Sequence, residues 1–163
     1  QVLARSCQSQ IIKSAVLVEP SGAMGQDGAL ELARRFGESV ADENQLHEQG
    51  KLETWWEEGN KWRRGPQYYF GLSLIQTLLE SKAIADANIS PGLRILRSLG
   101  VRIAVVHGNN DLVYPIYSVL QTLAGYVDEF VTMPGGRHQD VILRPAWYGK
   151  IIYDVLLRME AKV

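Results

Sequence analysis

Two residues in the C-terminal part of the chain could form an acid–base pair. Asp111 lies in a turn rich in Gly and Asn, directly after the apolar run 101–106, and His138 lies in a later turn that begins with two glycines. An imidazole titrates near neutral pH, so a histidine can take a proton from a reacting group and return it. A carboxylate that accepts the Nδ1 hydrogen of that histidine fixes its tautomer and stabilises the imidazolium.

Such a pair must be positioned by two loops at the same edge of a sheet. The run 101–106 is almost entirely apolar and mostly β-branched, which is typical of a strand buried on both faces. Residues 14–19 repeat this pattern, and residues 126–133 alternate weakly. Strands that alternate with helical patterns predict an α/β fold with about three parallel strands, in which ligands bind beyond the carboxyl ends. We therefore expect a carboxylate oxygen of Asp111 about 2.6–3.2 Å from a ring nitrogen of His138.

Each titratable side chain also has a simpler interpretation. Asp111 could close an Asx turn with its own backbone, and His138 could be a surface residue in a glycine turn. Glu19 ends the first strand and is a second candidate for the acid, although the proline after it is more typical of a strand end. His47 is expected to be solvated, because acidic and amide side chains surround it in the sequence. Three histidines without matching acidic spacing predict no metal site.

The sequence HGNNDLVYP, followed by GGRHQDVILRP, resembles the C-terminal end of the α/β-hydrolase superfamily. The resemblance is good over residues 101–160 and looser over residues 11–25. In that family the loop after the seventh strand carries the acid of a catalytic triad and the loop after the eighth carries the histidine, which the resemblance assigns to Asp111 and His138. The triad serine of the family lies in Gly-x-Ser-x-Gly, and this sequence has no such motif. The resemblance therefore implies a nucleophile upstream of this chain.

The resemblance also implies a division into a core and a lid. Residues 1–25 and 98–163 would form a partial hydrolase core, and residues 26–97 an inserted helical lid. Within the lid, a helix is predicted over 27–37, ended by a glycine. Ser90, followed by proline, is expected to cap a later helix that delivers the chain to the strand at 101.

Aromatic side chains are concentrated in the middle of the predicted lid. They could line an apolar substrate pocket, or they could equally form helix core that faces the main fold. The predicted substrate-binding residues are Trp55, Trp56, Trp62, Tyr69 and Phe70.

Composition excludes several classes of function. A formal net charge of −1 argues against attraction to nucleic acid or to an anionic membrane, and no apolar run reaches the length of about 18 residues that a membrane span needs. The single cysteine, Cys7, fits a reducing compartment, so we expect a cytoplasmic location. The first residue is Gln1 rather than Met, which suggests that an upstream part is missing.

The resemblance therefore implies the C-terminal portion of a hydrolase that cleaves an ester, amide or related bond of a small molecule, without a cofactor. Alone, the chain would be inactive. Its partner would be the complementary N-terminal half of the fold or a second copy of itself. The rival hypothesis is a non-catalytic half-fold that acts as a binding module. In a third hypothesis the complete protein is an enzyme, but its nucleophile is an aspartate instead of a serine, or its acyl acceptor is an alcohol instead of water.

Overall fold

The computed structural model describes residues 12–23, 28–49, 79, 82–138 and 140–161. The chain divides into two compact units, one formed by residues 1–25 with 87–163 and the other by residues 26–86. The first unit contains the sheet. The division into a hydrolase core of residues 1–25 and 98–163 and a lid of residues 26–97 stays a prediction.

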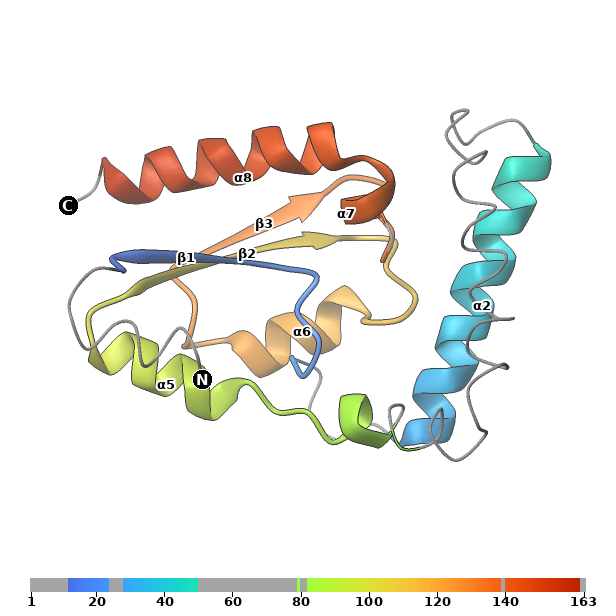
Figure 1. Cartoon of the computed structure of the whole chain (residues 1–163), viewed down its shortest axis with the longest axis horizontal. Helices are drawn as coiled ribbons and strands as arrows, with labels where there is room; N and C mark the ends of the chain where they lie inside the picture. The colour runs from blue at the N-terminus through green and yellow to red at the C-terminus, as the bar shows by residue number, and fades with distance from the viewer. Residues whose placement is uncertain (1–11, 24–27, 50–78, 80–81, 139, 162–163) are drawn as a thin grey trace. The chain divides into compact units, whose positions relative to one another are not determined.

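The sheet of the first unit has three parallel strands in the order β1-β2-β3 (Figure 1). These strands are β1 (Ser14–Val18), β2 (Arg102–Gly108) and β3 (Glu129–Met133). The register pairs Val18 with Val106 and Gly108 with Met133, so all three strands end at the same edge. The α/β fold with parallel strands is therefore confirmed, and the loops that contain Asp111 and His138 both leave from that edge.

Helices cover both faces of this sheet, with α8 on one face and α5 and α6 on the other (Figure 1). Their bounds are α5 (Ser90–Ser98), α6 (Ile116–Leu123), α7 (Asp140–Leu143) and α8 (Pro145–Glu160). The core between the sheet and α8 consists of Ala104, Val106, Met133, Tyr148, Val155 and Met159. Each fully buried large apolar side chain of this kind contributes about 1.5–3 kcal/mol to the free energy of unfolding, which anchors α8 to the strands.

The start of α5 differs from the prediction that Ser90 caps it. The residue at the N-cap is Ile89, which makes no side-chain capping bond, and Ser90 is already the first helical residue. The amide of Ser90 instead donates to Oδ1 of Asn88 at 3.0 Å. The asparagine side chain therefore satisfies an unpaired amide of the first turn, the service that a cap normally provides.

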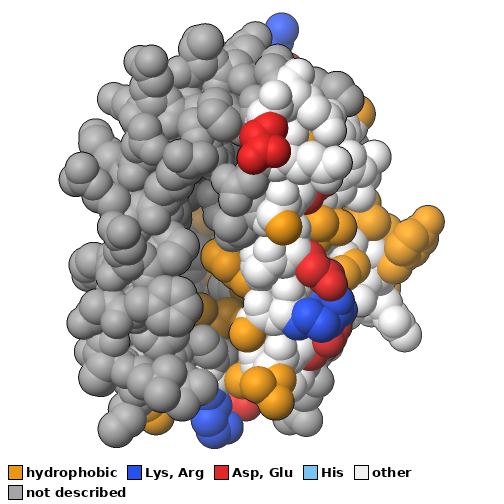
Figure 2. All heavy atoms as spheres, turned by 90° about the vertical axis from the view of Figure 1, so that its right-hand side faces the viewer, with side chains coloured by type: hydrophobic (Ala, Val, Ile, Leu, Met, Phe, Trp, Pro, Cys, Tyr) orange, Lys and Arg blue, Asp and Glu red, His pale blue; other side chains and the backbone are white. Residues whose placement is uncertain are grey.

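In the second unit, α2 (Ala29–Glu48) continues through Gly37, so the prediction that this glycine ends the helix was wrong. A glycine inside a helix costs only about 1 kcal/mol relative to alanine. Arg34 binds Glu31 at 2.6 Å and also pairs with Glu38, which holds the turns on both sides of the glycine together. Figure 2 shows one face of the molecule, on which acidic and basic side chains lie next to each other with hydrophobic ones beside them.

The predicted substrate-binding residues and the predicted location are not tested by the described residues. The five aromatic residues predicted to bind substrate lie outside the described residues. Within the described ranges, no helix combines the length and the hydropathy needed to cross a membrane. The cytoplasmic location stays a prediction.

Candidate active site

Asp111 is a buried carboxylate in the loop that follows β2. Its side chain retains 0% exposure, and its Oδ1 accepts the backbone amides of Val113 and Tyr114, both at 2.8 Å. Oδ1 of Asp111 therefore does close a turn with the nearby backbone, as the simpler interpretation expected. The same two hydrogen bonds fix the carboxylate plane, so the second oxygen has a defined direction.

The His138 loop is held against the Asp111 loop by direct backbone contact. A Cβ on Gly108 would come within 2.3 Å of the carbonyl oxygen of Gly136, so neither loop could approach this closely with a side chain there. The amide of Asn110 donates to the same carbonyl at 2.9 Å, and the amide of Gly135 donates to Oδ1 of Asn109 at 2.7 Å. Gly135 has φ of +72°, a conformation that favours glycine.

The predicted contact between Asp111 and His138 is present. Nδ1 of His138 lies 3.1 Å from Oδ2 of Asp111 and donates to it in the tautomer that this geometry favours. Burial raises the pKa of the Asp111 carboxyl, but the hydrogen bond and charge of His138 outweigh it and lower the pKa below its usual range. The His138 side chain is 19% exposed, and the Tyr114 ring meets it edge-on at 4.9 Å.

Glu19, the rival acid, faces a different histidine. It follows β1 with a left-handed backbone at φ of 43°, which costs a non-glycine residue about 1–2 kcal/mol. Its Oε1 accepts the amide of Gly108 at 2.8 Å and the hydroxyl of Tyr148 at 2.7 Å. Burial raises the pKa of Tyr148, so that hydroxyl remains a donor. In this structure Asp111, not Glu19, is the carboxylate that contacts His138.

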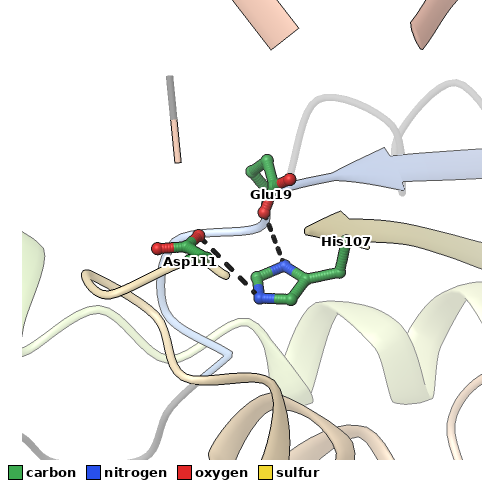
Figure 3. Close-up of side chains that lie close together, drawn as sticks. All are labelled: Glu19, His107 and Asp111. Carbon is green, nitrogen blue, oxygen red and sulfur yellow. Dashed lines mark ion pairs between the residues drawn. The ribbon is translucent and has the colours of Figure 1, made fainter. Parts of the chain in front are cut away.

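His107 lies between the two acids, as Figure 3 shows. Its fully buried ring places Nδ1 2.7 Å from Oε2 of Glu19 and Nε2 3.8 Å from Oδ2 of Asp111. The Glu19 oxygen approaches off the direction in which Nδ1 would donate, so the contact is a close ion pair rather than an aligned hydrogen bond. Nε2 donates to the carbonyl of Tyr114 at 2.7 Å.

The close approach of Oε2 of Glu19 to Nδ1 of His107 bears on the charge of the histidine. With Nε2 protonated toward Tyr114, a neutral His107 would direct its Nδ1 lone pair at a carboxylate oxygen. Burial lowers the pKa of His107, but Glu19 and the Tyr114 carbonyl outweigh that effect and raise it overall. The ring is therefore suited to carry the positive charge that compensates two buried carboxylates.

The donor atoms of Glu19, His107 and Asp111 lie within 4.8 Å of one another, a grouping that could in principle hold a metal ion. Two ligands on a tetrahedral Zn²⁺ at about 2.0–2.1 Å would be about 3.3 Å apart, whereas Nδ1 and Oε2 are separated by 2.7 Å. Nε2 of His107 already donates to a carbonyl, and Oε1 of Glu19 already accepts two donors. Their spacing and their existing partners within the protein do not suit a metal centre.

The contacts that join Glu19, His107, Tyr114 and Tyr148 were not predicted from the sequence. One signal was available, because β1 and β2 each end in a titratable residue and parallel neighbours bring such residues side by side. The register of Val18 with Val106 does this for Glu19 and His107. Nothing local in the sequence indicates that Tyr148, from α8, reaches the same carboxylate.

No model of a known protein family matches the chain, and no curated protein matches its sequence. Its structure is similar to that of a protein described as a non-heme bromoperoxidase from Mycobacterium tuberculosis, with 13% identity and a TM-score of 0.47 over 93% of this chain and 60% of the other. It is similar to an esterase from Thermogutta terrifontis, with 14% identity and a TM-score of 0.44 over 90% and 56%. It is also similar to Rv0554 of Mycobacterium tuberculosis, with 18% identity and a TM-score of 0.45 over 95% of this chain and 58% of the other.

At 13–18% sequence identity, these likenesses concern the fold alone. The chain spans about 56–60% of the length of the solved structures that it matches. The described residues themselves form an α/β fold with three parallel strands and a buried cluster of Glu19, His107 and Asp111 at the carboxyl ends of the strands.

Proposed function

We propose that the chain is the C-terminal portion of an α/β-hydrolase and that Asp111 and His138 are the acid and the histidine of its catalytic triad. The observation that supports this most directly is the distance of 3.1 Å between Oδ2 of Asp111 and Nδ1 of His138. The two residues come from loops at the carboxyl ends of neighbouring parallel strands, where α/β folds bind ligands. The sequence around both residues resembles the same family.

In this proposal His138 acts as the general base toward a serine. The serine hydroxyl gives its proton to Nε2 of His138 as Oγ bonds to the acyl carbon, and Asp111 stabilises the imidazolium. The same proton then passes to the leaving group as the ester or amide bond breaks. Water then gives a proton to His138 as its oxygen bonds to the acyl carbon. The bond from that carbon to serine Oγ breaks, and His138 returns the proton to Oγ. The 19% exposure of the His138 side chain gives a substrate access to the ring.

The nucleophile and most donors for the oxyanion come from a second polypeptide segment, because this sequence has no Gly-x-Ser-x-Gly. The substrate is a small molecule with an ester, amide or related bond, and the lid aromatics line its pocket. The reaction uses no organic cofactor or metal.

A non-catalytic binding module is the second candidate, and the open edge of β1 favours it. Among the described residues, β1 pairs only with β2, at one end of the sheet. Beside it runs a groove of about 410 Å³ lined mainly by apolar side chains of β1 and α5, including Val16, Val18, Leu93 and Leu96. An exposed strand edge with an apolar groove can recruit another strand.

The decisive experiment supplies the missing half. The 163-residue chain is expressed with an upstream segment that contains Gly-x-Ser-x-Gly, in cis or as a second chain, and is probed with a fluorophosphonate. We expect labelling of the upstream serine, loss of that labelling in His138→Ala, and no labelling of the 163 residues alone. Stable complex formation without labelling would favour the binding module, and strong labelling of this chain alone would contradict the proposal.

A further inference from the structure

Tyr114 contacts His107, Asp111 and His138, each through a different group. Its carbonyl accepts Nε2–H of His107 at 2.7 Å, and its amide donates to Oδ1 of Asp111 at 2.8 Å. Its ring meets the ring of His138 edge-on, with centroids 4.9 Å apart and planes at 77°. Tyr114 is itself buried. A shift of its backbone would therefore move both members of the Asp111–His138 pair.

His107 is built to hold that backbone in place. Its ring has no exposed surface, and Nδ1 is in contact with Glu19, which is in turn held by Gly108 and Tyr148. On the β3 side the ring packs against Phe130, with centroids 6.3 Å apart. Because both ring nitrogens and one face are engaged, the ring cannot rotate without breaking several contacts.

We propose that His107 is a positioning residue that orients Asp111 and His138 together, by holding the backbone of Tyr114 through its Nε2–H bond. This inference rests on the proposed function, because it gives a role to a histidine that the triad chemistry does not use. His107 itself does not reach the reacting atoms. Its partner Glu19 fixes which way the imidazole faces, so that Nε2 meets the Tyr114 carbonyl.

A purely electrostatic role is the competing explanation. The groups that face His107 are Glu19 at the end of β1, Asp111 in the loop after β2, and Tyr148 on α8, which touches the same Glu19 oxygen that Gly108 binds. A positively charged His107 would stabilise the Asp111 carboxylate across 3.8 Å without any help from Tyr114. The test must therefore remove the charge in every variant and vary only the hydrogen bond.

Two neutral amides make this separation. In His107→Gln the terminal amide occupies the position of Nε2 and can still donate to the Tyr114 carbonyl. In His107→Asn the amide is one bond shorter, occupies the position of Nδ1, and can donate to Glu19 only. Both variants lose the charge equally, so a difference between them reports the hydrogen bond to Tyr114.

The readout is the exchange rate of the Nδ1 proton of His138 with water, followed by NMR on the full chain labelled with ¹⁵N-histidine. In His107→Asn we expect this exchange to accelerate about fivefold or more, the effect of losing one typical hydrogen bond that supports the pair. In His107→Gln the rate should stay within about twofold of the parent, because the donor to Tyr114 is retained. Equal acceleration in both variants, or none in either, would overturn the proposal.

Two further measurements apply if a variant does not fold. In the parent chain, the ¹⁵N shift of His107 Nε2 must show a bound proton at every pH at which the chain is folded, and an unprotonated Nε2 would overturn the proposal. Tyr114→Ala keeps the amide but removes the ring, so it should disturb His138 and leave the Nε2–H signal of His107 in place. These readouts need no activity. If the reconstituted enzyme is inactive while the spectra are normal, the proposed function is contradicted. If activity is normal and His138 exchange is unaltered in His107→Asn, only this inference is contradicted.

Discussion

Among the described residues, two histidine–carboxylate pairs with N···O distances of 2.7 and 3.1 Å lie close together, and they differ in what surrounds them. In the Glu19–His107 pair both side chains are buried, Nε2 of the histidine is engaged by a backbone carbonyl, and its acid also holds a tyrosine hydroxyl. In the Asp111–His138 pair the acid is equally buried, but the histidine side chain is 19% exposed. Residue type and distance are alike in the two pairs. Access to a reacting molecule separates a pair suited to catalysis from one suited to holding the fold.

The largest effect expected from this comparison concerns Asp111 in the reconstituted enzyme. Asp111→Asn should lower turnover of a p-nitrophenyl ester about 10⁴-fold, because the amide no longer fixes the His138 tautomer or stabilises its imidazolium. Asp86→Asn is the matched control, since Asp86 lies in an exposed ion pair with Lys82. A loss of less than about tenfold for Asp111→Asn, with the fold intact, would remove this residue from the triad.

The other pair should control stability. Glu19→Ala leaves the buried His107, the hydroxyl of Tyr148 and the amide of Gly108 without their partner, and we expect it to lower the free energy of unfolding by about 3–5 kcal/mol. Glu19→Gln retains an acceptor for two of these donors and should cost less. Urea unfolding of the 163-residue chain measures both, with the exposed Glu160→Ala as control. Equal values for Glu19→Ala and Glu160→Ala would show that the pair does not hold the fold.

The two pairs should also divide the pH dependence of stability. The pKa of Asp111 is lowered on folding, so its contribution is present above the unfolded value of about 3.9 and is lost as pH falls through the folded value. The pKa of His107 is raised, so its contribution is complete below about 6.5 and is lost as pH rises through the folded value. Stability should therefore be greatest between about pH 4 and 6.5. Urea midpoints across pH test this, and in His107→Gln the decline on the alkaline side should disappear.

The smallest effect calibrates the others. Lys82 and Asp86 form an ion pair at 2.5 Å, but their side chains are 66% and 62% exposed. Lys82→Ala should change the free energy of unfolding by no more than about 0.5 kcal/mol, because solvent screens the pair. Thermal or urea unfolding gives the value. A cost comparable to that of Glu19→Ala would mean that burial does not decide what these pairs contribute.

Local patterns in the sequence predicted the features that depend on a few neighbouring residues. The run 101–106 predicted the central strand, and strand–loop order predicted that Asp111 and His138 would meet. A local signal also failed at Gly37, where α2 continues because a single interior glycine costs a helix only about 1 kcal/mol relative to alanine. The bond from Tyr148 to Glu19 joins residues 129 positions apart, and no pattern within one element specifies such a partner.

The close approach of Gly108 and Gly136 limits how this molecule can change in length. Gly108 serves both pairs, since its amide holds Glu19 and its Cα lies against the loop that carries His138. An insertion between Gly108 and Asp111, or between Met133 and His138, would separate the loops and alter both pairs at once. An insertion in the turn that directly follows α6, at Ala124 and Gly125, would leave this contact in place. Engineers who graft this chemistry onto another sheet would therefore need to transfer the two loops as one unit, with both glycines.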